Sequence, residues 1–374
     1  MSDAFLSDNH ERLAEKVRAF GDKVLRSRPH DETDPSAETR ALVSLMAGEG
    51  LLGAAVPPPH GYMDLRSLVV VREGLAYFSA LADTAFVMQG LGSYPIVVAG
   101  SDVQKTRWLP AVASGEVLAA FAVTEPEAGS DLASVRTRAE KDGALWRLEG
   151  VKTFISNAGL AGLYTVLARS GEGEGSKGLS MFLVDAEAPG LLIRPLEAMA
   201  PHPIGEVRFE GTPAVLVGEE GEGFATTLAT LEHFRPSVGA AACGLAWRAL
   251  DEALRFSLAR RQFGRSISQF QATKMALADM HVDLEAARLL VRRAAWTRDH
   301  GASIAREGAA AKLFATEAAQ RVVDRSVQIH GGHGVMRGST VERLYRDVRA
   351  LRIYEGTSEI QKLVIAREIL KEAR

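Results

Sequence analysis

The spacing of apolar residues changes twice along this chain, and this change limits the possible folds more than any other feature. Up to about residue 119, apolar side chains recur every three or four positions, as in Leu13, Val17 and Phe20, which is typical of amphipathic helices. From about 120 to 222 the apolar runs are short and strand-like, with Gly, Pro and Asp between them. From about 223 the helical spacing returns in longer stretches. The order helices, strands, helices is therefore predicted.

These three zones predict an α+β protein that is mainly α. Its expected parts are an N-terminal helical domain at 1–119, a β-barrel or sandwich at 120–222 and a C-terminal four-helix bundle at 223–374. One stripe with alternating spacings of three and four predicts the buried face of a bundle helix: Leu277, Met280, Leu284, Ala287, Val291 and Ala294. The segment Ser358–Gln361 matches a capping box, with Ser358 as the predicted cap of the last helix.

Composition excludes several classes of function. Apolar residues make up 47% of the chain and the net charge is -3, so nothing favours nucleic acid or an anionic membrane surface as a partner. The single cysteine, Cys243, excludes an internal disulfide and is expected in the core. No window reaches the roughly 18 apolar residues of a membrane span. We expect a cytoplasmic protein, or one in the mitochondrial matrix if a presequence was removed.

Two motifs resemble ligand-binding sequences, but the residues around them favour simpler interpretations. Gly173–Gly178 has the glycine spacing of a dinucleotide fingerprint, but Leu179–Val184 after it has the pattern of a strand. We therefore expect a hairpin loop, and a nicotinamide-dependent dehydrogenase would rest on this loop alone. His330 and His333 are too few for a metal site, and no nearby Cys or carboxylate cluster completes one. The glycines between them allow a backbone to approach another group closely.

Two other segments carry residues suited to chemistry. Thr124–Asp131 follows an apolar run and offers hydroxyl groups and backbone amides, although a solvated turn is the simpler interpretation of it alone. Glu355 lies between Tyr354 and Gly356, just before a helix. A lone loop glutamate is usually a surface residue, but apolar flanks would raise its pKa toward useful basicity.

Taken together, these segments resemble the acyl-CoA dehydrogenase family. Two stretches, 120–131 and 352–361, are similar to its two signature sequences. Four shorter matches occur in the same order as in the family: Lys105–Pro110, Phe154–Asn157, Arg260–Gly264 and Gln328–Gly332. The matches extend from about residue 84 to the C-terminus, and the layout of helices, strands and helices is also what this resemblance implies.

The resemblance implies FAD-dependent α,β-dehydrogenation of an acyl-CoA to the 2-enoyl-CoA. By match to the motif, Glu355 is the base that takes the α-proton, while the β-hydrogen leaves as hydride to the flavin N5. The developing enolate oxygen is bound in the family by the backbone N–H of this glutamate and a flavin ribityl hydroxyl. One branch of the family has its base directly before an arginine matching Arg235. Phe234 occupies that position and cannot accept a proton.

The resemblance also implies contacts with cofactor, substrate and partners. Expected at the ring and ribityl end of FAD are Phe121, Val123, Thr124, Gly129, Ser130, Phe154 and Ser156. Expected at its pyrophosphate, ribose and adenine end are Arg260, Phe263, Gln328, Gly331, Gly332, Thr357 and Glu359. Expected at the acyl-CoA are Ser130, Arg235, Tyr354 and Gly356. Arg260 and Gln328 match residues that complete a neighbouring subunit's site, which implies a homotetramer built as a dimer of dimers, and electron-transfer flavoprotein is the implied acceptor.

Several positions depart from the family pattern. Phe154 and Ser156 stand where many relatives have Trp and Thr, which pack on the flavin ring and bond to it. Gln262 and His330 also differ, which affects the adenine end. The segment Ala200–Gly205 replaces a polar run and has no assigned role.

The acyl group and the reaction class remain open to alternatives. Phe234, Tyr354 and Met88 are expected to narrow the acyl pocket, which favours short, branched or ring-bearing acyl groups. An acyl-CoA oxidase or a desaturase of carrier-bound acyl groups would share every motif. A non-catalytic scaffold of the same family is a third alternative, but the intact Glu355 argues against it.

Overall fold

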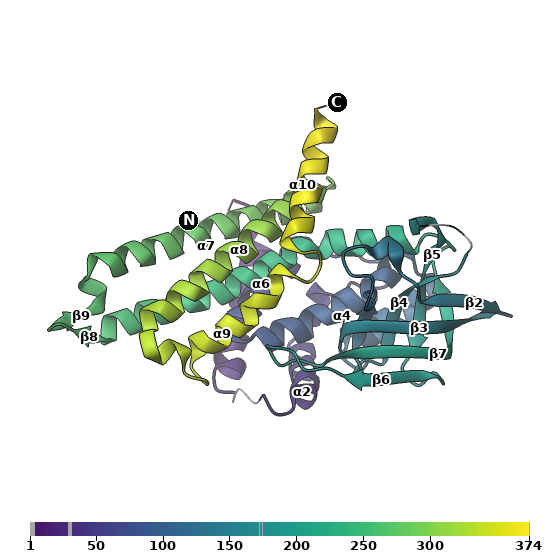
Figure 1. Ribbon diagram of the computed structural model, residues 1–374, viewed down its shortest axis with the longest axis horizontal. Helices are drawn as coiled ribbons and strands as arrows, with labels where there is room; N and C mark the ends of the chain where they lie inside the picture. The colour runs from purple at the N-terminus through teal and green to yellow at the C-terminus, as the bar shows by residue number, and fades with distance from the viewer. Residues whose placement is uncertain (1–3, 29–31, 172, 174, 374) are drawn as a thin grey trace. The chain divides into compact units, whose positions relative to one another are not determined.

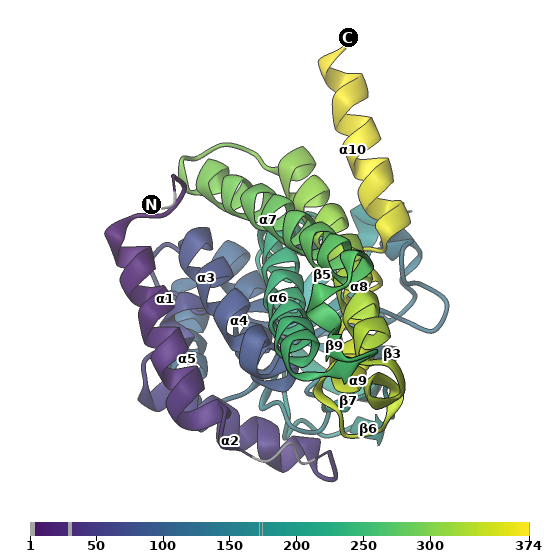
Figure 2. The same cartoon turned by 90° about the vertical axis from the view of Figure 1, so that its left-hand side faces the viewer.

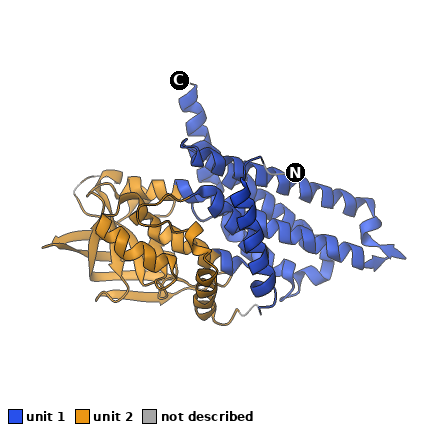
Figure 3. Ribbon diagram, turned by 180° about the vertical axis from the view of Figure 1, so that it is seen from behind, with its two compact units in different colours: residues 1–28, 64–83, 232–374 blue, residues 29–63, 84–231 orange. Residues whose placement is uncertain are grey.

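The computed structural model (Figure 1) describes residues 4–28, 32–171, 173 and 175–373, which form two compact units (Figure 3). Unit 1 comprises residues 1–28, 64–83 and 232–374, and unit 2 comprises residues 29–63 and 84–231. The predicted order of helices, strands and helices is confirmed. The domain limits at 119/120 and 222/223 stay predictions.

Unit 2 contains a mixed sheet of seven strands and several helices. The strands are β1 (Ala119–Ala122), β2 (Arg138–Asp142), β3 (Leu145–Ser156), β4 (Leu163–Arg169), β5 (Leu179–Asp185), β6 (Leu191–Pro195) and β7 (Ile204–Val217). The helical elements are α2 (Pro35–Gly48), η2 (Leu52–Ala54), part of α4 (Ala80–Ala99), α5 (Asp102–Ala113), η3 (Leu132–Ser134), η4 (Gly175–Gly178) and the start of α6 (Gly223–Ala259). Strands β4, β2, β3, β7 and β5 pair in a closed ring, because β5 also pairs with β4. The sheet therefore closes around a core that includes Trp146, Tyr164 and Phe182.

Two short strand-like runs of the sequence, Val207–Phe209 and Val215–Val217, are predicted as separate strands but are parts of one strand. Residues 207–209 and 215–217 both lie in β7, which continues through Gly211. Gly211 has a φ of 62°, and the pairing of β7 with β3 shifts by one residue next to it, between Leu148 and Glu149. A bulge thus lets the strand pass a glycine that looks like a turn in the sequence. The predicted hairpin loop at 173–178 does connect antiparallel strands, β4 and β5, although Glu174 lies outside the described residues.

Unit 1 is helical. Its elements are α1 (Asp8–Phe20), η1 (Gly21–Leu25), α3 (Leu65–Phe78), the first turn of α4, most of α6, η5 (Ile267–Gln269), α7 (Gln271–Asp299), α8 (Ala305–His330), η6 (Gly331–Val335), α9 (Thr340–Arg349), η7 (Ala350–Arg352) and α10 (Ser358–Glu372). A short hairpin of β8 (Arg261–Gln262) and β9 (Arg265–Ser266) joins α6 to α7. Helices α7 and α8 run side by side (Figure 2), and α8 also packs against α9 and α10.

The predicted buried stripe of α7 explains this packing. Five of its six residues, Met280 to Ala294, are buried, and Leu277 is partly buried. Gly239 of α6 faces the same helix so closely that a Cβ there would lie 2.7 Å from Val291. Cys243 is buried as predicted. Of the described helices, none is both long enough and apolar enough to cross a membrane.

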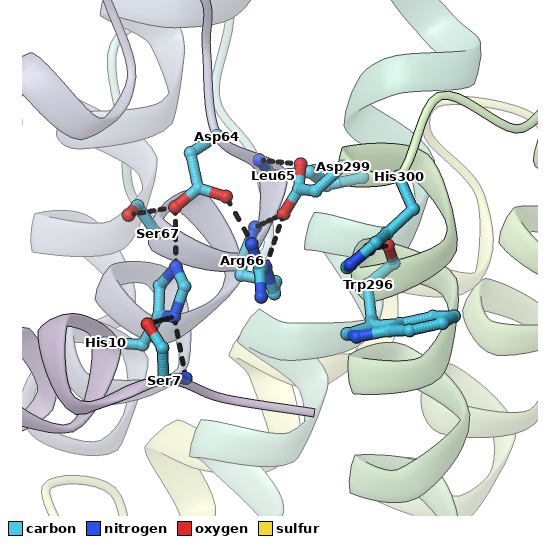
Figure 4. Close-up of polar contacts among 9 residues, drawn as sticks. All are labelled: Ser7, His10, Asp64, Leu65, Arg66, Ser67, Trp296, Asp299 and His300. Carbon is cyan, nitrogen blue, oxygen red and sulfur yellow. Dashed lines mark hydrogen bonds and ion pairs between the residues drawn. The ribbon is translucent and has the colours of Figure 1, made fainter. Parts of the chain in front are cut away.

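A polar network joins three helices of unit 1 (Figure 4). The His10 Nε2 lies 2.6 Å from Asp64 Oδ2, and its Nδ1 accepts the backbone N–H of Ser7 at 3.0 Å. Asp299, at the end of α7, accepts the backbone N–H groups of Leu65 and Arg66 at 2.8 and 3.1 Å. The first amides of a helix have no acceptor within the helix itself. Asp299, which belongs to α7, supplies the acceptor for these two and so caps α3.

Candidate active site

The backbone around Glu355 is held in an uncommon conformation. Glu355 has a φ of 54°, in the left-handed region, and Gly356 after it has a φ of 94°. This φ favours glycine, and a Cβ on Gly356 would also displace the Gln361 side chain, whose Nε2 would lie 2.6 Å away. Left-handed backbone at a residue other than glycine costs about 1–3 kcal/mol and is concentrated at functional sites. The conformation of this loop is therefore imposed by the residues around it.

Side chains from α8 and α10 impose it. Lys312 donates from Nζ to the Gly356 carbonyl at 2.7 Å. Gln361 donates to the same carbonyl at 2.9 Å and to the Glu355 carbonyl at 3.3 Å. On the two sides of the loop, Glu317 accepts from Arg352 at 2.9 Å and from Ser358 at 2.6 Å. Helix α8 thus fixes the loop with one cation and one carboxylate.

Ser358 is not the cap of α10, which corrects the prediction by one residue. Thr357 is the cap, and its hydroxyl accepts the Ile360 N–H at 3.4 Å. The Ser358 hydroxyl is used by Glu317 instead, and the Gln361 side chain bonds to loop carbonyls. Both residues therefore brace the loop of Glu355 and do not close a capping box.

The Glu355 carboxylate is a desolvated acceptor close to cations. Its Oε2 is buried and has no hydrogen-bond partner among the described residues. Burial raises the pKa of Glu355 above its ordinary value, and the charges of Arg72, Lys312 and Arg235 offset this in part. Burial also lowers the pKa of Lys312 to about 8, against the attraction of Glu355. An unpaired carboxylate with a raised pKa has the properties of a general base.

Arg72 is a buried cation next to this loop. It donates two hydrogen bonds to Asp83, both of 2.8 Å, and a third to the Ser237 hydroxyl, also of 2.8 Å. The side chains of Arg72 and Asp83 are 1% and 5% exposed. Arg72 also interacts with Tyr354, the neighbour of Glu355. The site therefore contains a fixed positive charge whose partner is a carboxylate on α4.

In unit 2 a buried ion pair holds the predicted flavin-binding turn after β1. Lys152 donates from Nζ to Glu125 Oε1 at 2.8 Å and to the Val123 carbonyl at 3.0 Å. Glu125 also accepts the backbone N–H groups of Arg136 and Thr137, at 2.7 and 2.8 Å. The pKa of Glu125 lies below its ordinary value. Burial by itself would raise this pKa, but Lys152 and the two amides outweigh the effect of burial. The segment is thus a braced turn, with Gly129 and Ser130 exposed at its end.

The end of β3 carries the other predicted ring contacts. Phe154 and Asn157 have φ values of 57° and 63°, and the pairing with β7 shifts between Lys152 and Ile155. This bulge turns Phe154 outward, and 67% of that residue is exposed. The Thr153 N–H donates to the Thr124 carbonyl at 2.9 Å, so the two predicted segments are adjacent. The structure therefore brings together Val123, Thr124, Phe154 and Ser156.

The residues predicted at the adenine end form a separate group in unit 1. Phe263, in the hairpin after α6, has a φ of 50° and is 93% exposed. The His330 ring stacks on Phe256 of α6 at 4.3 Å, which places the turn at Gly331 beside the end of that helix. Gln328, Gly331 and Gly332 are exposed. Arg235, Tyr354, Gly356, Thr357 and Glu359 belong instead to the surroundings of Glu355.

The residues of the β3 bulge fit a flavin. An exposed aromatic ring beside hydroxyl groups suits a flat cofactor ring that has hydrogen-bonding groups along its edge. Phe154 supplies the ring, and Ser156 and Thr124 are partly exposed next to it. No group of three metal-binding side chains occurs among the residues that the structure describes.

Sequence reasoning missed the supports of Glu355: Arg72, Asp83, Lys312 and Glu317. Three of the four are charged residues on the buried faces of helices: Arg72 lies four residues after Leu68, and Lys312 four after Gly308. A charge within an apolar stripe is rare unless it is paired, so this signal is present in the sequence. The sequence does not show that these charges surround Glu355, because that depends on how α3, α6 and α8 pack.

The Lys152–Glu125 pair allows a test by substitution. Lys152→Met is expected to lower the free energy of unfolding by about 3–5 kcal/mol, because it leaves a buried carboxylate without its cation. Arg147→Met, on the same strand, is the control: Arg147 is 46% exposed and bonds to Asp142 at 2.8 Å. Its loss is expected to cost at most about 1 kcal/mol. Urea unfolding measures both, and equal effects would contradict the role assigned to Lys152.

The comparisons with known proteins agree over nearly the whole chain. Residues 7–116, 120–212 and 221–370 match the N-terminal, middle and C-terminal domains of acyl-CoA dehydrogenase. The chain is 37% identical to the 3-(aryl)acrylate reductase of Clostridium sporogenes, over 98% of this chain and 100% of that protein. Butyryl-CoA dehydrogenase from Megasphaera elsdenii has a TM-score of 0.92 and 32% identity, covering 99% of this chain and 100% of that one. A chain of a structure described as the electron transferring flavoprotein of Acidaminococcus fermentans has a TM-score of 0.93 and 33% identity, with coverage of 99% and 100%. The chain belongs to the acyl-CoA dehydrogenase family.

Proposed function

We propose that this protein is an FAD-dependent acyl-CoA dehydrogenase that uses Glu355 as its base and produces a 2-enoyl-CoA. The observation that carries the proposal is the Glu355 carboxylate, which is desolvated, unpaired at Oε2 and held in a left-handed backbone conformation. Membership of the family supports the reaction class. A non-catalytic scaffold would have no reason to retain a strained, unpaired glutamate.

The residues of this chain would act on the α-carbon of the acyl group. When bound, FAD supplies the acceptor for the β-hydrogen. Glu355 takes the α-proton at its carboxylate, and its backbone N–H binds the thioester oxygen as negative charge develops there. Lys312 and Gln361 keep that N–H in position by holding the carbonyls of Glu355 and Gly356. Arg235 and Gly356 contact the acyl-CoA.

We place the flavin ring at the β3 bulge, with Phe154 packing on it and Ser156 bonding to it. The turn formed by Phe121, Val123, Thr124, Gly129 and Ser130 completes this end of the FAD site, and Ser130 also contacts the acyl-CoA. Arg260, Phe263, Gln328, Gly331, Gly332, Thr357 and Glu359 bind the rest of FAD. The exposure of Phe263 and of the Gly331 turn supports a role of both toward a neighbouring subunit.

Electron-transfer flavoprotein is the proposed acceptor. The structural similarity to a chain described with that flavoprotein supports it. An acyl-CoA oxidase or a desaturase of carrier-bound acyl groups is the alternative, and rapid turnover with oxygen as the sole acceptor would favour the oxidase.

The reaction is tested by mixing the purified protein anaerobically with a panel of acyl-CoAs while flavin absorbance is followed. Bleaching of the flavin and appearance of 2-enoyl-CoA are expected with at least one member. A colourless protein that takes up no FAD would contradict the proposal.

The same panel tests the acyl group. We expect a preference for short, branched or ring-bearing acyl groups, because Phe234 is fully buried in α6 and Tyr354 and Arg72 occupy space beside Glu355. The relatives named for butyryl-CoA and for 3-(aryl)acrylate are consistent with this expectation. The kcat/KM should fall by roughly tenfold or more toward long straight chains. A maximum at about twelve carbons or longer would contradict it.

We propose a homotetramer. Helix α7 has exposed apolar residues at every seventh position, Met275, Val282 and Leu289, with exposures of 61%, 65% and 54%. A row of this kind is typical of a helix that packs against another chain. Light scattering should give four times the chain mass of 40.2 kDa. A monomer at micromolar concentration would contradict the proposal.

A further inference from the structure

His202 lies in the segment Ala200–Gly205, to which no role was assigned from the sequence. Two backbone hydrogen bonds fix this segment. The Asn157 N–H, just after β3, donates to the Pro203 carbonyl at 2.8 Å, and the Leu196 N–H, just after β6, donates to the Ile204 carbonyl at 2.9 Å. Ile204 also pairs with Ser156 in the sheet. The segment therefore runs directly beside Ser156, the residue proposed to bond to the flavin ring.

The hydrogen bonds of His202 determine which ring nitrogen carries the proton. Its Nδ1 lies 3.0 Å from the Ala200 carbonyl, which can only accept, so Nδ1 must donate. Burial lowers the pKa of His202, so the ring is neutral near pH 7. A neutral imidazole has one N–H, which leaves Nε2 as an acceptor.

This tautomer sets the direction of the next hydrogen bond. The Nε2 lies 3.4 Å from the Ser156 hydroxyl oxygen, at the long end of the hydrogen-bond range. Because Nε2 accepts, the Ser156 hydroxyl must donate its only hydrogen to His202. The Ser156 oxygen can then offer only lone pairs to any other group.

We infer that His202 is a positioning residue that makes the Ser156 hydroxyl a hydrogen-bond acceptor toward the flavin and so favours the reduced cofactor. This inference rests on the proposed FAD site. The oxidised ring has acceptors along its polar edge, whereas reduction turns N5 into an N–H donor. A serine that can only accept matches the reduced ring. A serine free to donate could also bond to the oxidised ring, which would remove this preference.

The inference is tested by a double-mutant cycle on the midpoint potential of the FAD-loaded protein. His202→Phe keeps an aromatic ring and removes both nitrogens, which frees the Ser156 hydroxyl to donate. The ratio of reduced to oxidised flavin at a fixed potential should fall by about tenfold, or about 30 mV for a two-electron couple. In a Ser156→Ala background the same substitution should have no effect. His60→Phe, at an exposed histidine of unit 2, is the control.

Two outcomes would overturn the inference: an unchanged potential in His202→Phe, or an equal shift with and without Ser156. Loss of FAD from the wild-type protein would instead refute the proposed function, so the two failures are distinguishable. A second measurement needs neither FAD nor a stable variant. The ¹⁵N resonances of the His202 ring in the wild-type apoprotein should show a protonated Nδ1, and a protonated Nε2 would overturn the inference.

Discussion

Glu355→Gln is expected to slow anaerobic flavin bleaching by acyl-CoA by at least ~10²-fold, the size typical of a lost general base. An amide has the shape of the carboxylate but cannot take the α-proton. The supports of the loop should survive, because Lys312 and Gln361 bond to backbone carbonyls and not to the glutamate side chain. FAD should therefore remain bound, and the spectrum of the resting protein should be unchanged.

Glu232→Gln is the matched control. Glu232 lies three residues before Arg235, near the position that carries the base in one branch of the family, and it accepts from the Ile304 N–H at 3.3 Å. Its bleaching rate should stay within about twofold of wild type. If Glu232→Gln abolished bleaching and Glu355→Gln did not, the assignment of the base would be wrong.

The two glutamate variants should also differ in stability. The pKa of Glu355 is raised in the folded protein, so ionisation of this group opposes folding as the pH rises through its folded value. At neutral pH, Glu355→Gln removes this cost and should melt at the same temperature as wild type or above it. A stable protein with lost activity is the pattern expected when catalysis requires a buried charge that destabilises the fold.

Asp83→Asn is expected to lower the free energy of unfolding by about 3–5 kcal/mol, because Arg72 would keep its charge in a buried site without its carboxylate. Both partners are nearly inaccessible to solvent, and their two hydrogen bonds are each 2.8 Å. Asp283→Asn is the control, because Asp283 pairs with the half-exposed Arg321 across α7 and α8. That substitution should cost at most about 1 kcal/mol. Equal losses in urea unfolding would contradict the role of the buried pair.

Substitution of either partner of this pair should shift the pH profile of bleaching, and the two substitutions should shift it in opposite directions. Bleaching needs an ionised Glu355, so its rate falls as the pH drops through the pKa of that group. Asp83 raises the pKa of Glu355 and Arg72 lowers it. Asp83→Asn should therefore shift the acidic limb to lower pH, and Arg72→Met should shift it to higher pH. Shifts in the same direction would show that the pair acts on Glu355 through structure alone.

The fold could be predicted from the sequence because each zone has its own apolar spacing. The stripe from Met280 to Ala294 of α7 is one clear case, since spacing determines which face of a long helix is buried. Local signals were less reliable. Gly211 looks like a strand end but forms a bulge, and the cap of α10 is Thr357, one residue before Ser358. In both places contacts with a neighbouring element decide the outcome.

Glu355 could be identified by its motif, but the surroundings that would make it a base could not. Its left-handed backbone results from hydrogen bonds made by Lys312, 43 positions earlier, and by Gln361. The charge of Arg72 comes from a helix still further away in the sequence. The spacing of residues within one element cannot show that three elements converge on one carboxylate. A charge within an apolar stripe indicates only that some partner exists.

Removal of the α-proton by Glu355 is tested by a single anaerobic turnover with an acyl-CoA that carries deuterium on its α-carbon. The flavin is expected to bleach and one 2-enoyl-CoA to form for each FAD. Deuterium on the α-carbon is expected to slow bleaching, because the α-C–H bond breaks in that step. An FAD-loaded protein whose flavin stays oxidised with every acyl-CoA offered, or bleaches without forming an enoyl product, would contradict this reaction.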